Sequence, residues 1–378
     1  MKLYYDRRVP SLFHEGIICQ DTDFLIEQDK WLFTSNVSDA DIIPCSFSKF
    51  CEGDLPALND DQILMVYYIE TSGAHVSPEY CRQLIINSPM QHKKTIYIHT
   101  NALDTTDTKY IHYDIMFNRQ KLFATDYDDD ICSGNKCWIW GAPKYTYSLS
   151  PINKEFSTDN KLFFCPVRVL DNQRSTTNLV GNFNDTKESL RNHLIQLNAN
   201  MYLSDPVNGV FFEPNGWKDN PEVAHFETRT GGRWYPAADH YYETSYVSVC
   251  VESLYQESNI FYPCEKYFDP LLKGNFPLVF APAHTIQRMK DYYGFVFPDW
   301  IDYSYDNIED IEQRFVSYLD SVTKVSRMSL EDIHQLYVKD KSILEHNRNV
   351  FFTKPYDSLY QKVKNAVTQL GWLGTQSS

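Results

Sequence analysis

Three charged residues in segment 246–274 have the types and the spacing to hold a nucleotide diphosphate. Glu252 ends an apolar run typical of a strand, and Glu265 and Lys266 open a segment typical of a helix that ends at Gly274. A helix N-terminus binds phosphate readily, because its N–H groups are unpaired and its dipole end is positive. A carboxylate can accept ribose hydroxyls, and an ammonium group adds charge for the phosphates. The alternative is a solvated turn followed by an ordinary charged first turn.

Arginines around the preceding strand and helix could add charge to the same cleft. Arg168, Arg174 and Arg191 lie there, and guanidinium groups bind phosphate bidentately while staying charged at any relevant pH. We expect Arg191 or Arg174 to reach the cleft. For each of them the alternative is an ordinary surface arginine.

The first half of the chain offers three candidates for a general base. Asp114 is predicted to lie inside an apolar strand, where a carboxylate is either a satisfied structural group or a base. Glu70 and His75 follow another predicted strand, in a loop with small residues of the kind that often carries catalytic groups. Asp114, Glu70 and His75 are therefore the candidate bases.

No metal site is predicted. The acidic run Asp126–Asp130 resembles the DxD element that chelates a divalent cation in some sugar transferases, but a solvated turn explains it better. The nine cysteines include no CxxC pair, which favours reduced structural thiols over zinc. The sequence also lacks GxGxxG, GxxxxGK[ST], HExxH and GxSxG, so dehydrogenases, P-loop enzymes, zincins and α/β-hydrolases are disfavoured.

The elements that must position these residues alternate between short apolar runs and helix-like segments, which predicts an α/β fold with largely parallel sheets. A helix is predicted from Asp185, as its cap, and helices are predicted to the end of the chain from Asp306 onward. The predicted domains are residues 1–155, 156–325 and 326–378, the last being helices that pack back on the other two. The predicted strands are 41–45, 62–69, 95–99, 110–117, 136–140, 162–170, 246–251 and 276–281.

Composition limits the classes of partner and location. A chain of 378 residues with 43% hydrophobic and 22% charged residues is typical of a globular protein with two domains. No apolar run reaches the length of a membrane span and no secretory signal is recognisable, so we expect a cytoplasmic location and no membrane partner. The net charge of −15 disfavours nonspecific nucleic-acid binding.

The segment 243–315 resembles the C-terminal nucleotide-sugar domain of fucosyltransferase-like glycosyltransferases, including glycosyltransferases of phages and large viruses. The resemblance rests on an acidic residue that ends the first strand, a Glu-Lys pair that opens the helix and a glycine before the next strand. These features occur in SVCVES (248–253), CEKYFDPLLKGNFPLVFAP (264–282) and YGFVFPDWIDYSYDNIEDIEQRF (293–315). In the first half, only YIHYDIMFNR (110–119) looks similar to a segment of the phage and viral relatives.

This resemblance implies a GT-B architecture, in which two Rossmann-like domains face a cleft and the second binds the donor. It also implies that Glu252 and Glu265 contact the ribose or sugar, that Lys266 contacts the phosphates, and that metal is dispensable. The acceptor would be a glycan or, as in some phage relatives, hydroxymethylcytosine in DNA. A viral protein would then act in the host cytoplasm.

The predicted function is therefore a glycosyltransferase that uses a nucleotide-diphosphate sugar and needs no further cofactor. Two alternatives remain. The first is a glycoside hydrolase with two carboxylates such as Glu252 and Glu265. The second is a non-catalytic glycan-binding or scaffold protein on a degenerate transferase fold.

Overall fold

The structure is a computed structural model of the whole chain. The chain folds into two compact units and crosses between them more than once. Unit 1 consists of Met1–Leu122, Asp126–Ile139 and Tyr356–Ser378, and unit 2 consists of Phe123–Thr125 and Trp140–Pro355. The residues described are 1–4, 29–53, 57–68, 86–88, 92–99, 107–114, 117–118, 121, 152–166, 183–205, 210–213, 216–219, 241–252, 255, 261 and 263–372.

Unit 1 is built on a six-stranded sheet in the order β2-β1-β3-β4-β5-β6, and every neighbouring pair is parallel. This is the strand order of a doubly wound Rossmann-like sheet, in which the chain turns back once, between β1 and β3. The elements are β1 (Lys2–Tyr4), β2 (Leu32–Thr34), the 3₁₀ turn η2 (Val37–Asp39), β3 (Ile42–Ser46), α2 (Phe47–Glu52), β4 (Ile63–Tyr68), β5 (Thr95–His99), β6 (Tyr110–His112) and α13 (Leu359–Gln369).

Two helices cover the two faces of this sheet. On one face, Phe50 of α2 packs with Leu64 and Val66 of β4. The other face packs against α13, whose buried residues follow the i, i+4, i+7, i+8 spacing of an apolar helical face. Ser358 caps α13 by accepting a hydrogen bond from the Gln361 N–H group at 3.1 Å. The helical residues in this second cluster are Leu359, Val363, Ala366 and Val367.

Unit 2 is built on a six-stranded sheet in the order β10-β9-β8-β7-β11-β12. The neighbouring strands β8, β7, β11 and β12 are parallel. β9 and β10 extend the sheet beyond β8 as an antiparallel hairpin. The strands are β7 (Lys161–Pro166), β8 (Met201–Asp205), β9 (Val210–Glu213), β10 (Gly216–Asp219), β11 (Ser245–Val251) and β12 (Phe276–Phe280).

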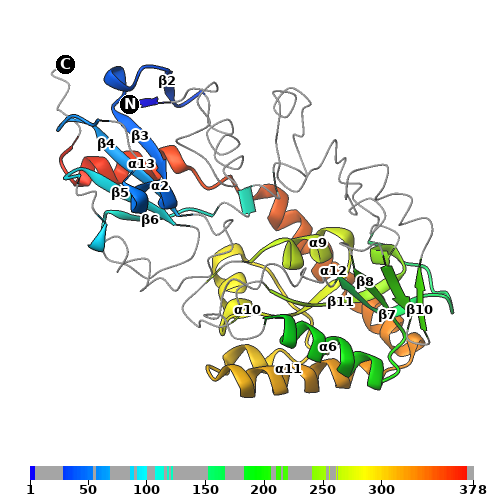
Figure 1. Cartoon of the computed structure of the whole chain (residues 1–378). Coiled ribbons are helices and arrows are strands. Elements are labelled where there is room, and N and C mark those ends of the chain that lie inside the picture. Colours follow the sequence, from blue (N-terminus) through cyan, green and yellow to red (C-terminus); the bar gives the residue numbers. More distant parts are fainter. Residues whose placement is uncertain are drawn as a thin grey trace. The chain divides into compact units, whose positions relative to one another are not determined.

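Helices lie on both faces of the second sheet, with α6 and α11 along one face and α9 and α12 along the other (Figure 1). His193 of α6 hydrogen-bonds Thr323 of α11 at 2.9 Å, and Tyr246 of β11 reaches His334 of α12 at 3.1 Å. The helical elements are α6 (Phe183–Gln196), α9 (Glu265–Lys273), α10 (Thr285–Arg288) with the π-helical turn η4 (Met289–Tyr293), the 3₁₀ turn η5 (Ser304–Asn307), α11 (Ile311–Ser326) and α12 (Leu330–Thr353).

The predicted α/β class with two Rossmann-like sheets and C-terminal helices is confirmed. Two predicted helix starts were wrong. Helix α6 begins at Phe183, so Asp185 lies in the first turn and is not the cap. Helix α11 begins after Asp310, whose side chain accepts the Gln313 N–H group, and Asp306 lies in the preceding 3₁₀ turn. No helix in the described part of the chain is both long and apolar enough to cross a membrane.

Gly274 ends α9 with φ +81°, and a Cβ atom there would lie 3.3 Å from the Tyr337 hydroxyl. We expect Gly274→Ala to lower the free energy of unfolding by roughly 2–3 kcal/mol, because left-handed strain and crowding add. Gly294 is the matched control, since its φ is +84° but a Cβ would meet nothing within 4 Å. In urea unfolding of both variants, Gly294→Ala should lower the free energy of unfolding by only about 1–2 kcal/mol. Equal losses in the two variants would rule out a contribution from crowding against Tyr337.

Candidate functional site

The sheet of unit 2 changes its winding direction between β7 and β11. The chain leaves β7 for β8 on one side, whereas β11 pairs with β7 on the other side and continues to β12. Open α/β sheets bind ligands at such a switch point, outside the carboxyl ends of the strands. β7 ends at Pro166, and β11 ends at Val251, directly before Glu252. The topology therefore puts Glu252 at the position where a ligand is expected.

Glu252 is buried, with only 1% of its surface exposed. Its N–H group donates to the Phe280 carbonyl at 2.8 Å, which extends the pairing of β11 with β12. Its Oε1 atom accepts the Cys264 N–H group at 3.1 Å, and its Oε2 atom accepts the Cys264 thiol at 2.7 Å. The carboxylate thus fixes the residue from which α9 begins.

Lys266 completes a small polar group at the start of α9. Its Nζ atom lies 3.5 Å from Oε2 of Glu252 and 3.0 Å from Sγ of Cys264, and the side chain is 13% exposed. Cys264 is the N-cap of α9 and makes no side-chain capping bond, and the negative charge at this positive end of the helix dipole comes from the Glu252 carboxylate. Glu265 opens the helix as predicted, and the position of its side chain lies outside the described residues.

A second polar group follows the edge strand β12. His284 has a left-handed backbone, with φ 64° and ψ 13°, and its Nε2 atom lies 2.7 Å from Oε1 of Glu309. The buried Asp306 carboxylate accepts the N–H groups of Ile286 at 3.0 Å and Gln287 at 3.1 Å, so it caps α10. Burial raises the pKa of Asp306, while these backbone hydrogen bonds oppose the rise. No sequence spacing predicted this group, because the partners are 19 to 25 residues apart and meet only through the fold.

In unit 1, Asp114 lies at the carboxyl end of the sheet, but not inside a strand as predicted. β6 ends at His112, and Asp114 caps the following turn, with Oδ1 accepting the Phe117 N–H group at 3.2 Å. The residue is 6% exposed. The predicted strand is cut short because the backbone turns at Asp114, whose carbonyl accepts the Asn118 N–H group at 3.2 Å. The Asp114 N–H group donates to Oδ2 of Asp357 at 2.9 Å.

The other predicted site residues are less well placed or not described. Arg191 lies in α6, eight residues after Phe183 and therefore about 12 Å along the helix from its start. Glu70, His75 and Arg174 lie outside the described residues, as does the acidic run Asp126–Asp130. Among the residues that are described, no group of three or more His, Cys, Asp or Glu side chains could hold a metal ion.

Comparison with solved structures gives a distant likeness to a known protein. No known protein family matches the chain, and no curated protein matches it. A solved structure described as a crystal structure of an alpha1,3-fucosyltransferase is similar to this chain with a TM-score of 0.46 and 11% sequence identity. The alignment covers 98% of this chain and 88% of that one.

Proposed function

We propose that the protein is a glycosyltransferase, which moves a sugar from a nucleotide-diphosphate sugar to an acceptor hydroxyl. The observation that supports this function is the connected group of Glu252, Cys264 and Lys266 at the N-terminus of α9. It combines an ammonium group, a helix N-terminus and a topological switch point at the carboxyl ends of the strands. These are the features that bind a diphosphate without requiring a metal.

The proposed donor site divides the work between neighbouring side chains. Lys266 contacts the phosphates, Glu265 contacts the ribose or sugar, and Arg174 or Arg191 supplies further positive charge. Both oxygens of Glu252 already accept hydrogen bonds from Cys264, so its main contribution is to hold Cys264 and Lys266 in place, with ribose contact as a lesser one. The helix dipole and these cations neutralise the leaving diphosphate, and we therefore propose that the reaction needs no metal.

In the proposed reaction, the acceptor oxygen bonds to the anomeric carbon while the bond from that carbon to the diphosphate breaks. The acceptor proton passes to Asp114, Glu70 or His75, and the bonding electron pair leaves with the diphosphate. A glycan acceptor suits a net charge of −15 better than hydroxymethylcytosine in DNA, since DNA binding is largely electrostatic.

The two alternatives make different demands on the same residues. A glycoside hydrolase needs two carboxylates about 5 to 9 Å apart across an open sugar cleft. Both oxygens of Glu252 already contact Cys264, and Oε2 also lies near Lys266, which disfavours that role. A non-catalytic glycan-binding or scaffold protein would tolerate the loss of Lys266 without loss of its ligand.

The proposed donor site can be tested by nucleotide binding. We expect one of the adenosine, cytidine, guanosine, thymidine or uridine diphosphates to raise the melting temperature with and without manganese. Lys266→Ala should weaken that nucleotide by about 10- to 100-fold in calorimetric titration, because an ammonium–phosphate contact is lost. Lys339→Ala is the control, since this exposed lysine of α12 lies outside the site.

Three results would contradict the proposal. Equal affinity in Lys266→Ala and wild type would remove Lys266 from the site. Stabilisation only with manganese would move the diphosphate toward Asp126–Asp130 and overturn metal independence. An absence of any nucleotide binding would favour the hydrolase or the scaffold protein.

A further inference from the structure

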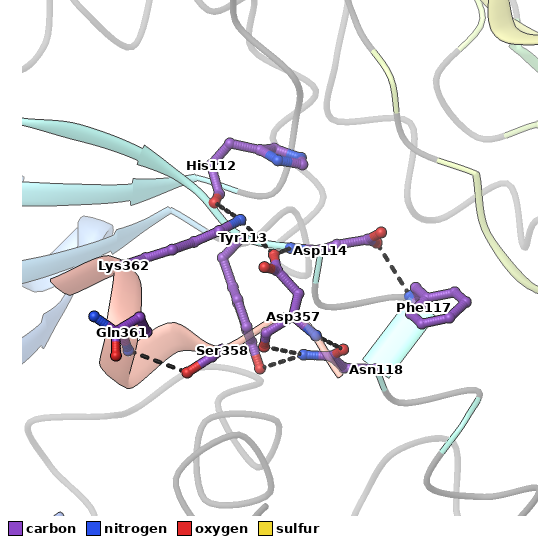
Figure 2. A network of polar contacts seen from close by, with 9 residues as sticks. All are labelled: His112, Tyr113, Asp114, Phe117, Asn118, Asp357, Ser358, Gln361 and Lys362. Carbon is purple, nitrogen blue, oxygen red and sulfur yellow. Dashed lines mark hydrogen bonds and ion pairs between the residues drawn. The ribbon is translucent and has the colours of Figure 1, made fainter. Parts of the chain in front are cut away.

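The C-terminal segment returns to unit 1 directly beside the candidate base. The chain passes from unit 2 into unit 1 between Pro355 and Tyr356 and then forms α13. Asp357, one residue into this return, lies against the turn that follows β6 (Figure 2). Residues 114 and 357 are 243 positions apart in the sequence, so this proximity is a product of the fold alone.

Two reciprocal hydrogen bonds join the backbone of Asp357 to the side chain of Asn118. The Asp357 N–H group donates to Oδ1 of Asn118 at 2.8 Å, and Nδ2 of Asn118 donates to the Asp357 carbonyl at 2.8 Å. Asn118 is fully buried, and its Nδ2 atom also donates to the Tyr113 hydroxyl at 2.9 Å. Nearby, the ammonium group of Lys121 lies 5.2 Å from the ring centroid of Tyr356. The returning segment is therefore fixed to the turn after β6 at several points.

The side chain of Asp357 holds the backbone of Asp114 itself. Oδ2 of Asp357 accepts the Asp114 N–H group at 2.9 Å and the Lys362 ammonium group at 2.5 Å. Lys362 of α13 also donates to the His112 carbonyl at 2.7 Å, so both residues that flank Tyr113 are held by residues 357–362. In Figure 2 the Asp114 carboxylate points away from Asp357 and toward the Phe117 N–H group. Asp357 thus acts on the backbone of Asp114 and not on its carboxylate.

We propose that Asp357 is a positioning residue, which fixes the orientation of Asp114 as the group that takes the acceptor proton. This inference rests on the proposed function and selects Asp114 from the three candidate bases. A base must be held within a fraction of an ångström of its productive position, and partners that hold its backbone provide that precision. The Asp357–Lys362 ion pair suits this role because Lys362, a residue of α13, holds the Asp357 carboxylate beside the Asp114 N–H group.

The test is turnover of Asp357 variants, measured as nucleotide release from UDP-, GDP- and dTDP-sugars with water as acceptor. We expect Asp357→Ala to lower kcat about tenfold or more, with the KM for the donor and the nucleotide affinity unchanged. Asp357→Asn should recover most of that loss, because its amide oxygen can still accept the Asp114 N–H group. Asp60→Ala serves as the control, since Asp60 is an exposed residue of unit 1 away from these contacts.

A double-mutant cycle separates positioning from a general structural effect. Once Asp114→Asn has removed the base, adding Asp357→Ala should lower kcat no further. Independent effects of the two substitutions, or wild-type kcat in Asp357→Ala, would overturn the proposal while leaving the donor site of unit 2 untouched. A wild-type protein that neither binds a nucleotide nor releases one would overturn both proposals. If Asp357→Ala does not fold, Asp357→Ser takes its place, because serine is too short to reach the Asp114 N–H group.

Discussion

Replacing Arg314 with methionine is expected to lower the free energy of unfolding by roughly 3–5 kcal/mol. Arg314 lies in α11 and is completely buried. Its Nη1 atom donates to the carbonyls of Ile308 at 2.7 Å and Glu309 at 2.9 Å, and Nη2 donates to the carbonyl of Tyr255 at 2.7 Å. Methionine can fill much of the volume but donates no hydrogen bond. Three carbonyl groups would therefore lose their shared donor inside the protein.

The measurement is urea unfolding of wild type, Arg314→Met and Arg314→Lys. Lysine keeps the charge, but a single ammonium group cannot reproduce the planar fork that reaches all three carbonyls, so most of the loss should remain. Arg327→Met is the matched control, because Arg327 is exposed at the end of the same helix and should change stability by no more than about 0.5 kcal/mol. If Arg314→Met lowers the free energy of unfolding by less than about 1 kcal/mol, the hydrogen bonds of the buried guanidinium group to the three carbonyls do not contribute to stability as expected.

The position of Arg314 also bears on the polar group beyond β12. The carbonyl of Glu309 bonds to Arg314, while the Glu309 side chain pairs with His284. Loosening this loop should therefore affect His284, whose left-handed backbone is held in part by an N–H bond of 2.6 Å to the Asp306 carbonyl. Faster amide exchange at residues 284–287 in Arg314→Met would report that effect directly.

Local signals in the sequence were sufficient to predict the elements around the donor site. An apolar run predicted β11, the Glu265-Lys266 pair predicted the start of α9, and Gly274 predicted its end, where the backbone is left-handed. These features depend on residues within one or two turns of each other.

Contacts that depend on topology could not be predicted in this way. Asp114 was expected inside a strand because its neighbours are apolar, yet the chain turns there, and the Asp114 N–H group bonds to Asp357, which is 243 positions away in the sequence. Glu252 was correctly expected at a strand end, but its burial against Cys264 could not be read from their spacing. The predicted domain boundaries and the roles of Glu70, His75, Arg174 and Arg191 stay predictions.

Lys154 is expected to make the stability of the protein rise between neutral and alkaline pH. Its ammonium group is buried, donates to the Tyr242 carbonyl and to Oδ1 of Asn275 at 2.7 Å, and lies 5.4 Å from the Tyr337 ring centroid. Burial lowers the pKa of Lys154 from 10.5 to about 7, against the opposing influence of Glu243. The folded protein therefore releases this proton near pH 7, whereas the unfolded chain keeps it until about pH 10.5.

The sign of the effect follows from proton binding. Between these two values the unfolded state binds more protons than the folded state, so the free energy of unfolding rises with pH. At about 1.36 kcal/mol per pKa unit, the contribution approaches 5 kcal/mol over the whole window, and roughly 2–3 kcal/mol between pH 7.5 and 9.5. The pH range of the measurement ends at 9.5 because burial also raises the pKa of tyrosines such as Tyr305. Above their ordinary pKa of 10, tyrosines of the unfolded chain lose their protons first, so stability should fall.

Lys154→Met removes the titrating group, so the difference in unfolding free energy between wild type and this variant should grow in favour of wild type as the pH rises. The lost hydrogen bonds shift that difference by a constant and leave its slope unchanged. Lys161→Met is the control, because Lys161 is only half-buried and its removal should leave the pH dependence of wild type intact. Parallel curves for wild type and Lys154→Met from pH 7.5 to 9.5 would mean that this ammonium group keeps its proton inside the fold, held by the Asn275 side chain and the Tyr337 ring.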